Sequence, residues 1–392
     1  MRSYLLVISV LCLTASCSNE LSKVHQRLVL VDTHNDLLTS QTMDGKDVSQ
    51  RLTTGHSDIP RLKEGGVDVQ FFSVWTGEKA RNKEGFFSDA MEQIDSLEFI
   101  AIRNVDKMKL TSGYSDVKKI LRQKKLVGLI GVEGGHMIEE DLQKLETLYN
   151  RGMSYLTLTH NNSVSWASSA RDETERAETL SQKGLNDFGR EVVKRLNERG
   201  IMIDLSHVGE KTFYDVLEIT TKPVILSHSS VYAISPHFRN VTDDQIKAVA
   251  KNNGVICVNF YSSFLNAEFN EAYEKLKGPE GKTIKDSVQG LYADRKDKVK
   301  YWEEYVAGIL ERYRPSYTSI ADHIDYIVKL VGVNYVGIGA DLDGVDSLPV
   351  GFDDATDYPL ITGELMKRGY SIADIKKIMG KNVLRVLKAN TQ

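Results

Sequence analysis

Eight short apolar runs alternate along this chain with longer stretches of helical periodicity. Most of the runs are nearly continuous in apolar residues, which is typical of parallel strands buried on both faces. We expect strands at residues 28–33, 67–74, 126–132, 155–159, 201–206, 223–227, 254–260 and 335–340. Because helical patterns separate the strands, this order predicts an α/β protein whose eight parallel strands close into a (β/α)8 TIM barrel.

The helical patterns are amphipathic, and they indicate how the chain is organised. They cover residues 141–149, 185–199, 243–252, 319–331 and 371–387. Residues 266–317, between the seventh and eighth strands, are charged and mostly helical, with little apolar mass for a core of their own. We therefore expect one barrel domain over residues 28–392 that contains a helical insertion at about 266–317.

Charge and cysteine content exclude two classes of protein. The 392 residues carry a net charge of -4, whereas a nucleic-acid-binding protein usually has a basic surplus. Three cysteines are too few for a disulfide framework. Cys257 lies within an apolar run, so we expect it to be a small core residue. The composition thus predicts a globular protein without a nucleic-acid partner.

The first residues have the pattern of an export signal. Arg2 is followed by an apolar run at residues 4–13, which is shorter than the ~20 residues of a membrane-spanning helix. Small residues then precede Cys17, as at a bacterial lipoprotein processing site. We expect a signal peptide at residues 1–16, acylation of Cys17 and a linker at 17–27. The protein would then be exported, as a periplasmic or outer-membrane lipoprotein that meets the membrane only through its anchor.

Polar residues gather where the expected strands end. In a barrel enzyme the carboxyl ends of the strands meet at one face, where the catalytic groups lie. The residues at these ends that suit metal binding or acid–base chemistry are His34, Asp36, Glu133, His160, His207, His228 and Asp341. Four histidines at equivalent places, joined by three carboxylates at the same or further strand ends, indicate one shared site.

The residue types at these ends favour zinc. His34 and Asp36 are two residues apart, so both side chains face one centre if the chain stays extended. Neutral imidazole nitrogen and carboxylate oxygen form a ligand mixture that suits zinc. Glu133 has two oxygens with which to bridge two metals, and His207 and His228 would complete the second. A single metal remains open, although five ligand candidates exceed what one catalytic zinc usually takes.

Seven motifs follow one another along the chain in a fixed order. They are Val31-Asp-Thr-His-Asn-Asp36, Gly131-Val-Glu-Gly-Gly-His136, Tyr155-Leu-Thr-Leu-Thr-His-Asn161, Ile203-Asp-Leu-Ser-His-Val208, Pro223-Val-Ile-Leu-Ser-His-Ser-Ser230, Phe238-Arg-Asn240 and Val336-Gly-Ile-Gly-Ala-Asp-Leu-Asp-Gly344. Each motif alone has little specificity. In this order the set resembles the membrane dipeptidase (renal dipeptidase) family, zinc peptidase family M19, over about residues 28–387.

The resemblance implies a metallo-dipeptidase with two zinc ions per chain. His34 and Asp36 would bind one zinc, His207 and His228 would bind the other, and Glu133 would bridge them. A hydroxide that bridges the metals would attack the peptide carbonyl. The expected substrates are dipeptides, L,D-dipeptides among them, and the expected assembly is a homodimer.

The resemblance also assigns residues to the substrate. His160 and Arg239 would contact it, and Asp341 would assist proton transfer near the scissile bond. Arg239 carries a planar guanidinium that matches a free carboxylate in two hydrogen bonds. Since a dipeptide ends in a carboxylate one residue beyond the scissile bond, Arg239 would select for that length.

Two other functions remain open at this point. One is a different binuclear-metal amidohydrolase that acts on cyclic amides or lactones. Such enzymes commonly have His-x-His on the first strand and a carbamylated lysine bridge, whereas Asp36 and Glu133 stand at those places here. The other is a surface lipoprotein that binds peptides without catalysis, which would have no need of Asp341.

Overall fold

Eight parallel strands form a closed TIM barrel in the computed structural model, which describes residues 20–291 and 295–392. The strands are β1 Leu30–Asp32, β2 Val67–Val74, β4 Leu126–Glu133, β5 Met153–Thr157, β6 Met202–Asp204, β7 Ile225–Leu226, β8 Val255–Val258 and β9 Val336–Ile338. Pairing between β2 and β4 closes the ring. All eight expected strands are present, and the predicted fold class is confirmed. Cys17 and the expected signal peptide lie outside the described residues.

A ninth strand, β3 Met108–Leu110, was not predicted. It pairs with the first residues of β4, whereas β5 pairs with β4 only from Ile130 onward. The short strand therefore covers an edge at the amino end of β4 that β5 leaves open. Three residues with an exposed lysine at their centre carry no apolar run by which sequence analysis could find them.

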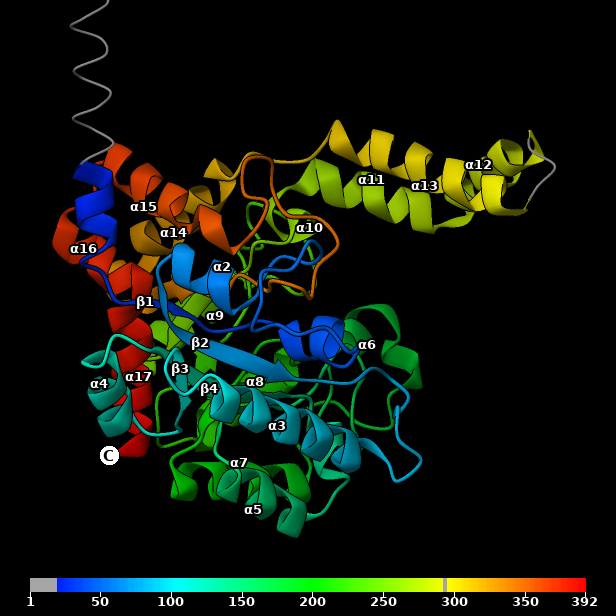
Figure 1. Cartoon of the computed structure of the whole chain (residues 1–392). Coiled ribbons are helices and arrows are strands. Elements are labelled where there is room, and N and C mark those ends of the chain that lie inside the picture. The colour runs from blue at the N-terminus through cyan, green and yellow to red at the C-terminus, as the bar shows by residue number, and fades with distance from the viewer. Residues whose placement is uncertain (1–19, 292–294) are drawn as a thin grey trace, which may run out of the picture.

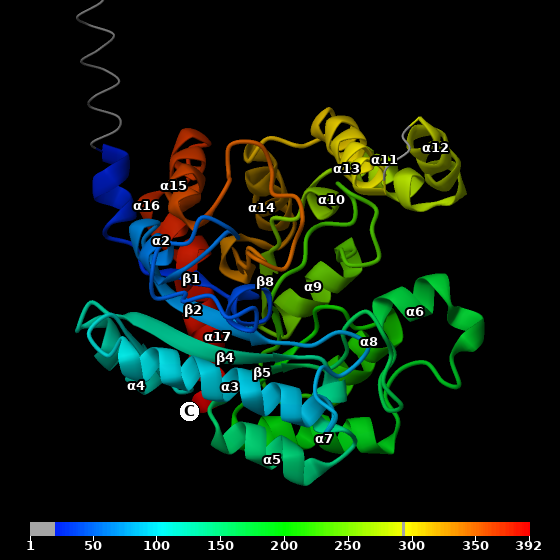
Figure 2. The same cartoon turned by 45° about the vertical axis from the view of Figure 1, so that its right-hand side comes forward.

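Helices surround the barrel on all sides (Figures 1 and 2). Those up to β8 are α2 Ile59–Glu64, α3 Phe86–Arg103, α4 Tyr114–Leu121, α5 Leu142–Asn150, α6 Ala170–Glu175, α7 Asp187–Arg199, α8 Glu210–Ile219 and α9 Asp243–Lys251. The later ones are α10 Ser262–Leu265, α14 Thr318–Val331, α15 Tyr358–Lys367, α16 Ile372–Lys376 and α17 Asn382–Thr391. No helix of the described residues has both the length and the apolar character that a bilayer crossing requires.

Local sequence explains where the predicted helices begin and turn. Asn186 caps α7, Thr242 and Gln245 form a capping box at α9, and Ser371 caps α16. The helical pattern predicted at 371–387 is one path that bends at Gly380, whose backbone angles are not helical. The bend lets the last turns of the chain cross the bottom of the barrel.

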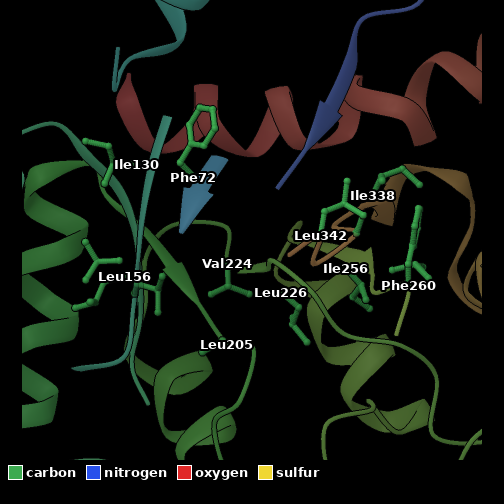
Figure 3. Close-up of a cluster of buried hydrophobic side chains, with 14 of the residues drawn as sticks. Phe72, Ile130, Leu156, Leu205, Val224, Leu226, Ile256, Phe260, Ile338 and Leu342 are labelled. Carbon is green, nitrogen blue, oxygen red and sulfur yellow. The ribbon is translucent and has the colours of Figure 1, made fainter. Parts of the chain in front are cut away.

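Two buried clusters make up the core. The larger one lies between the strands and the surrounding helices, and Figure 3 shows part of it around Phe72, Leu156 and Ile256. The smaller one lies inside the barrel, since it contains the alternate strand residues such as Phe71 and Tyr155. Residues of α4 and α17 complete the inner cluster, so these two helices close the barrel at the amino ends of its strands.

Three helices project from the barrel between β8 and β9. They are α11 Ala267–Lys277, α12 Pro279–Gly290 and α13 Arg295–Glu311, and Figure 1 shows them extending away from the barrel. This segment coincides with the charged residues 266–317 that were expected to be helical. The Tyr273 side chain at its base lines the cavity described below, so the projecting helices contribute to the site.

Candidate active site

The carboxyl ends of the strands bring the predicted metal ligands together. His34 and Asp36 follow β1, Glu133 ends β4, and His207 and His228 follow β6 and β7. Three overlapping groups of side chains have ligand atoms within 4.8 Å of one another, and Glu133 belongs to two of them. The third group joins His34 and Asp36 with Asp341. All five predicted ligands are at most 7% exposed.

The carboxylate of Glu133 lies at the centre of the cluster. Its Oε2 is 3.4 Å from His34 Nε2, and its Oε1 is 3.0 Å from His207 Nε2 and 3.3 Å from His228 Nε2. Asp36 Oδ2 lies 3.4 Å from the same His34 nitrogen. One oxygen of Glu133 thus faces the His34–Asp36 pair and the other faces the His207–His228 pair, as a bridging ligand requires.

Hydrogen bonds fix the tautomer of His34. Its Nδ1 is 2.8 Å from the Tyr155 hydroxyl, which also lies 3.1 Å from the Thr33 carbonyl oxygen. Since that carbonyl only accepts, Tyr155 donates to it and accepts from His34 Nδ1–H. When the ring is neutral, its lone pair is therefore on Nε2, which faces the two carboxylates.

The other two imidazoles are held in the same way. His228 Nδ1 is 2.7 Å from Ser227 Oγ, whose own proton goes to Asp204 Oδ2 at 2.6 Å. His207 Nδ1 is 3.1 Å from Asn161 Oδ1. Each Nδ1–H therefore donates away from the cluster, and each Nε2 lone pair points into it.

Gly131 makes room for the Tyr155 ring, because a residue without a side chain lets the β4 backbone and the ring approach each other closely. A Cβ atom at Gly131 of β4 would overlap the Tyr155 ring. Glycine at this position lets the ring cross the barrel interior and place its hydroxyl under His34. This contact ties a residue of β5 to one after β1, 121 positions apart in sequence.

The charges of the cluster favour a cation. Burial alone would raise the pKa of Glu133, but the adjacent imidazoles, above all the charge of His34, outweigh it and hold that pKa well below its usual range. Burial lowers the pKa values of His207 and His228 well below normal, so both imidazoles are neutral at neutral pH. For His34, burial opposes protonation, but the nearby Tyr155, Glu133 and Asp36 raise its pKa well above normal.

The residues present fit a pair of metal ions. His34 Nε2 and Asp36 Oδ1 are buried without any hydrogen-bond partner, and such orphaned atoms are rare in folded proteins. His207 Nε2 and His228 Nε2 lie only 2.9 Å apart, an arrangement that two neutral lone pairs do not favour by themselves. A cation on each side of Glu133 would satisfy all of these atoms. Nitrogen and oxygen ligands of this kind suit zinc.

Arg239 is buried beside the cluster without an acidic partner. It is 4% exposed, and among the described residues no carboxylate oxygen lies within the 4.0 Å of an ion pair. Its Nη2 donates to the His228 carbonyl at 3.1 Å, and the guanidinium lies 5.4 Å above the Phe264 ring. Burial lowers its pKa to about 10, so it stays charged at neutral pH. An unpaired buried cation indicates a place for an anion.

His160 and Asp341 flank the cluster. The His160 ring lies 4.5 Å from the His207 ring and 5.0 Å from the Trp75 ring, and burial lowers its pKa to about 4. Asp341 Oδ1 is 3.9 Å from His34 Nε2, and Asn259 donates to its Oδ2 at 2.8 Å. Burial is the largest cause that raises the pKa of Asp341 well above normal.

One cavity of about 400 Å³ joins all of these groups. Its wall includes Glu133, His160, Arg239 and Asp341, and Tyr273 of the projecting helices. The volume is in the range of small-molecule sites. Every predicted site residue within the described part of the chain therefore lies in or directly behind one cavity.

The side chains that orient the imidazoles were not predicted, and Tyr155 is one of them. Asp32, two residues before His34, has a different role: it accepts from the backbone N–H groups of His34 and Ala340 and from the Tyr358 hydroxyl. It therefore joins β1 to the turn after β9. Strand parity places Tyr155 inside the barrel, two residues before the end of β5, but its contact with His34 depends on how the closed barrel packs.

Asp343, two residues after Asp341, holds loops together beside the site. Its carboxylate accepts from Gln41 Nε2 at 3.0 Å and from the His56 backbone N–H at 2.8 Å. It thus fixes the loop after β1 to the turn after β9. Cys257 is fully buried in the inner cluster, as expected of a core residue.

Comparison with protein families gives one match over most of the chain. Residues 18–392 match the family model described as membrane dipeptidase (peptidase family M19). The match includes every strand of the barrel and all of the residues that line the cavity.

Solved structures of similar fold come from proteins of low sequence identity. A probable dipeptidase, PvdM, from Pseudomonas aeruginosa has a TM-score of 0.79 at 22% identity, over 96% of this chain and 99% of its own. The dipeptidase AC, a metallo peptidase of family M19, has a TM-score of 0.73 at 23% identity, with 93% and 98% covered. A metallo peptidase from Rhodobacter sphaeroides, liganded with a phosphinate mimic of the dipeptide L-Ala-D-Ala, has a TM-score of 0.73 at 21% identity, with 93% and 99% covered.

Proposed function

The chain belongs to the membrane dipeptidase family, peptidase family M19, and from this premise we propose that it hydrolyses dipeptides with two bound zinc ions. The observation that carries the proposal is the position of Glu133 between three imidazole nitrogens. A buried carboxylate shared by two ligand pairs is suited to hold two dications close together.

The metal ligands follow from the geometry around Glu133. His34 and Asp36 would hold one zinc, His207 and His228 the other, and Glu133 both. When bound, two zinc ions polarise a carbonyl oxygen and lower the pKa of water, which provides a nucleophile at neutral pH. The neutral state of His207 and His228 keeps their Nε2 lone pairs available.

Arg239 would bind the carboxylate at the end of the dipeptide. Its guanidinium is charged, buried and free of any acidic partner among the described residues. A substrate carboxylate would supply the missing charge in a bidentate contact. A longer peptide would place an amide there instead, so this contact would restrict hydrolysis to dipeptides.

His160 would stabilise the negative charge that develops in the reaction, and Asp341 would transfer the proton. His160 is neutral, so one of its ring nitrogens can donate to the carbonyl oxygen as negative charge develops on it. Asp341 would accept a proton from the attacking water and deliver it to the amine nitrogen as the C–N bond breaks. Asn259 holds the other carboxylate oxygen and fixes the direction of Asp341.

The substrates that we propose include L,D-dipeptides. The Rhodobacter sphaeroides metallo peptidase of similar fold is liganded with a mimic of L-Ala-D-Ala. We therefore propose hydrolysis of L-Ala-D-Ala by this chain, and inhibition by its phosphinate mimic. L-Ala-L-Ala measured beside it would report the stereochemical preference.

Arg239→Ala tests the assignment of substrate and anchor together. The variant should lose about 2–5 kcal/mol of transition-state binding for free dipeptides, the range for one buried charge pair. Amidation of the dipeptide's carboxyl end should reduce transition-state binding by the wild type by about the same amount. It should reduce transition-state binding by the variant little further. Equal hydrolysis of free and amidated dipeptides by the wild type would contradict the anchor. Hydrolysis of cyclic amides or lactones in preference to dipeptides would contradict the substrate class.

The cellular location and assembly are further proposals. We propose that Cys17 is acylated, that the protein is exported as a periplasmic or outer-membrane lipoprotein, and that it forms a homodimer. A mass of the amino-terminal peptide that includes two or three acyl chains would support the anchor, and Cys17→Ser should remove them. Light scattering of the purified protein would measure the assembly.

A further inference from the structure

Positive charge is concentrated in one short segment of the chain. Residues 103–125 contain eight lysines and arginines and two aspartates, a net charge of +6, although the whole chain has a net charge of -4. The remaining residues therefore carry -10. We call the surface formed by residues 99–125 the basic face. It comprises the end of α3, strand β3, helix α4 and the turn into β4.

The topology places the basic face opposite the cavity. β3 pairs in parallel with β4, so the turns that enter these two strands lie at the amino ends of the barrel strands. Lys125 Nζ donates to the Val105 carbonyl at 2.7 Å and joins the two turns. Helix α4 also closes the bottom of the inner cluster. The catalytic groups lie at the carboxyl ends of the strands, at the other end of the barrel.

Most of these cations are available to a partner. Six of the eight are exposed: Arg103, Lys109, Lys118, Lys119, Arg122 and Lys124. Among the described residues, Lys119 is the one of the eight that has a carboxylate within 4.0 Å, that of Asp116 at 2.7 Å. Lys388 of α17 extends the charge, since Lys118 and Lys388 lie 5.7 Å and 6.0 Å from the same Tyr114 ring.

Exposed apolar side chains lie beside the cations. Phe99, Ile102 and Val105 are 59%, 74% and 61% exposed, respectively. All three belong to the end of α3 and the turn that follows it. Large apolar residues that are exposed within a basic surface combine the two features of an interfacial membrane-binding site, because the cations meet anionic headgroups and the apolar groups enter between them.

We propose that the basic face binds the surface of a bilayer that contains anionic phospholipids. The first described residues, 20–25, form a helical turn on α15, and His25 contacts Thr362 there. Figures 1 and 2 show this start of the chain and helix α4 toward one side of the molecule, with the projecting helices toward the other. Binding through the basic face would turn the cavity mouth away from the membrane. The proposal is independent of the reaction that the cavity performs.

Vesicle partitioning tests the proposal with the full chain. All proteins would carry Cys17→Ser to prevent acylation, and would be mixed with vesicles of phosphatidylcholine alone or with added phosphatidylglycerol. The test variant is Lys109→Gln, Lys118→Gln and Arg122→Gln. The control variant is Lys83→Gln, Lys282→Gln and Lys285→Gln, which changes the net charge equally at exposed positions elsewhere. The ratio of binding to the two vesicles cancels any contribution from the amino-terminal apolar run.

The proposal predicts a clear difference between the two variants. Each cation near an anionic surface strengthens binding roughly fivefold, so the test variant should lose about 100-fold of its preference for anionic vesicles. The control should stay near wild type, and raising the salt from about 0.15 M to about 1 M should remove most of the preference. Ile102→Asp provides a second variant, which should weaken binding without removing a cation.

Two results would overturn the proposal. One is equal binding of the wild type to neutral and anionic vesicles. The basic face would then not recognise anionic phospholipids, and its partner would be a different polyanion. The other is an equal loss in the test and control variants, which would make net charge the cause and not the basic face. Thermal melting of each variant would show that it is folded before its binding is compared.

Discussion

Three histidines of the site share one arrangement. In His34, His207 and His228, Nδ1 has a hydrogen-bond acceptor behind it and Nε2 faces Glu133. The acceptors come from different elements: a tyrosine on β5, an asparagine after β5 and a serine after β7. The motifs predicted the histidines, but the acceptors were not predicted because each is brought to its ring by tertiary packing and not by spacing.

Tyr155→Phe should separate this orienting role from packing. The ring stays in the inner cluster, but His34 Nδ1–H loses its acceptor. Loss of such a partner typically lowers metal affinity or activity about 10–100-fold. Zinc affinity can be measured by competition with a chelating dye. Tyr370→Phe, which removes a hydroxyl contact to Asp325 far from the cavity, is the control and should leave zinc affinity unchanged. Equal affinities in all three proteins would contradict the role of Tyr155.

Asp341→Asn should separate proton transfer from metal binding. The amide keeps the size of the carboxyl group and can still pair with Asn259, but it cannot accept and return a proton. The expected result is a fall of about 10²–10⁴-fold in kcat, with zinc content unchanged. Loss of zinc from the variant would instead make Asp341 a ligand, since it lies among the third group of candidate ligand atoms.

At the scale of elements, burial explains why the presence of the strands could be predicted. The residues at which they end depend on tertiary contacts that the sequence pattern does not contain. The eight apolar runs were predicted because each strand is buried on both faces. Six of their eight ends were placed too far along: the run at 335–340, for example, forms β9 only over Val336–Ile338. Beyond Ile338 the chain turns, and Asp341 takes a positive φ of 62° that carries its carboxylate toward His34. The pattern of apolar residues contains no information about such turns.

Helix α14 contributes a buried histidine that holds two segments beside the site, the loop after β7 and the end of α10. His323 is fully buried, with Nδ1 accepting from the Val231 N–H at 2.9 Å and Nε2 donating to the Leu265 carbonyl at 3.1 Å. The first contact fixes the loop after β7 that contains Arg239, and the second fixes the end of α10. Both contacts require the neutral ring.

The protonation of His323 should make stability fall in mild acid. Burial lowers its pKa from 6.5 to about 4, so the unfolded chain binds the proton more tightly. This contribution is fully present above pH 6.5 and is lost as the pH falls from 6.5 toward 4, by at most about 3 kcal/mol. Unfolding by urea at several pH values measures it. His323→Gln, which can keep both hydrogen bonds, should have a shallower slope, and an unchanged slope would contradict the assignment.

At the scale of the whole molecule, the barrel gathers seven candidate metal-binding and proton-transfer residues from six strand ends into one cluster. The cluster is strongly charged and almost fully buried, a state that costs free energy unless a cation neutralises it. The fold class, and the gathering of the candidate site residues at one face of the barrel, could be predicted because the apolar runs are followed by polar residues at the carboxyl ends of the strands. The projection of α11–α13 and the position of the basic face could not be predicted, since both depend on how helices pack against a closed barrel.

Removal of metal should therefore lower the stability of the whole domain. An ion that binds only the folded state stabilises it by about 2.7 kcal/mol at a free concentration of 100 Kd. A chelator should lower the melting temperature, and zinc should restore it. Glu133→Gln should melt at nearly the same temperature with and without chelator, because it has lost the bridging charge. A chelator effect of equal size in that variant would place the stabilising metal elsewhere.

The most direct test of a dipeptidase with two metals is to titrate the metal-free enzyme with zinc while measuring dipeptide hydrolysis. The arrangement of four further candidate ligands around Glu133 predicts that hydrolysis of L-Ala-D-Ala rises until two zinc ions per chain have been added and then stays constant. Full activity at one zinc ion per chain, or no hydrolysis of any dipeptide at saturating zinc, would contradict it.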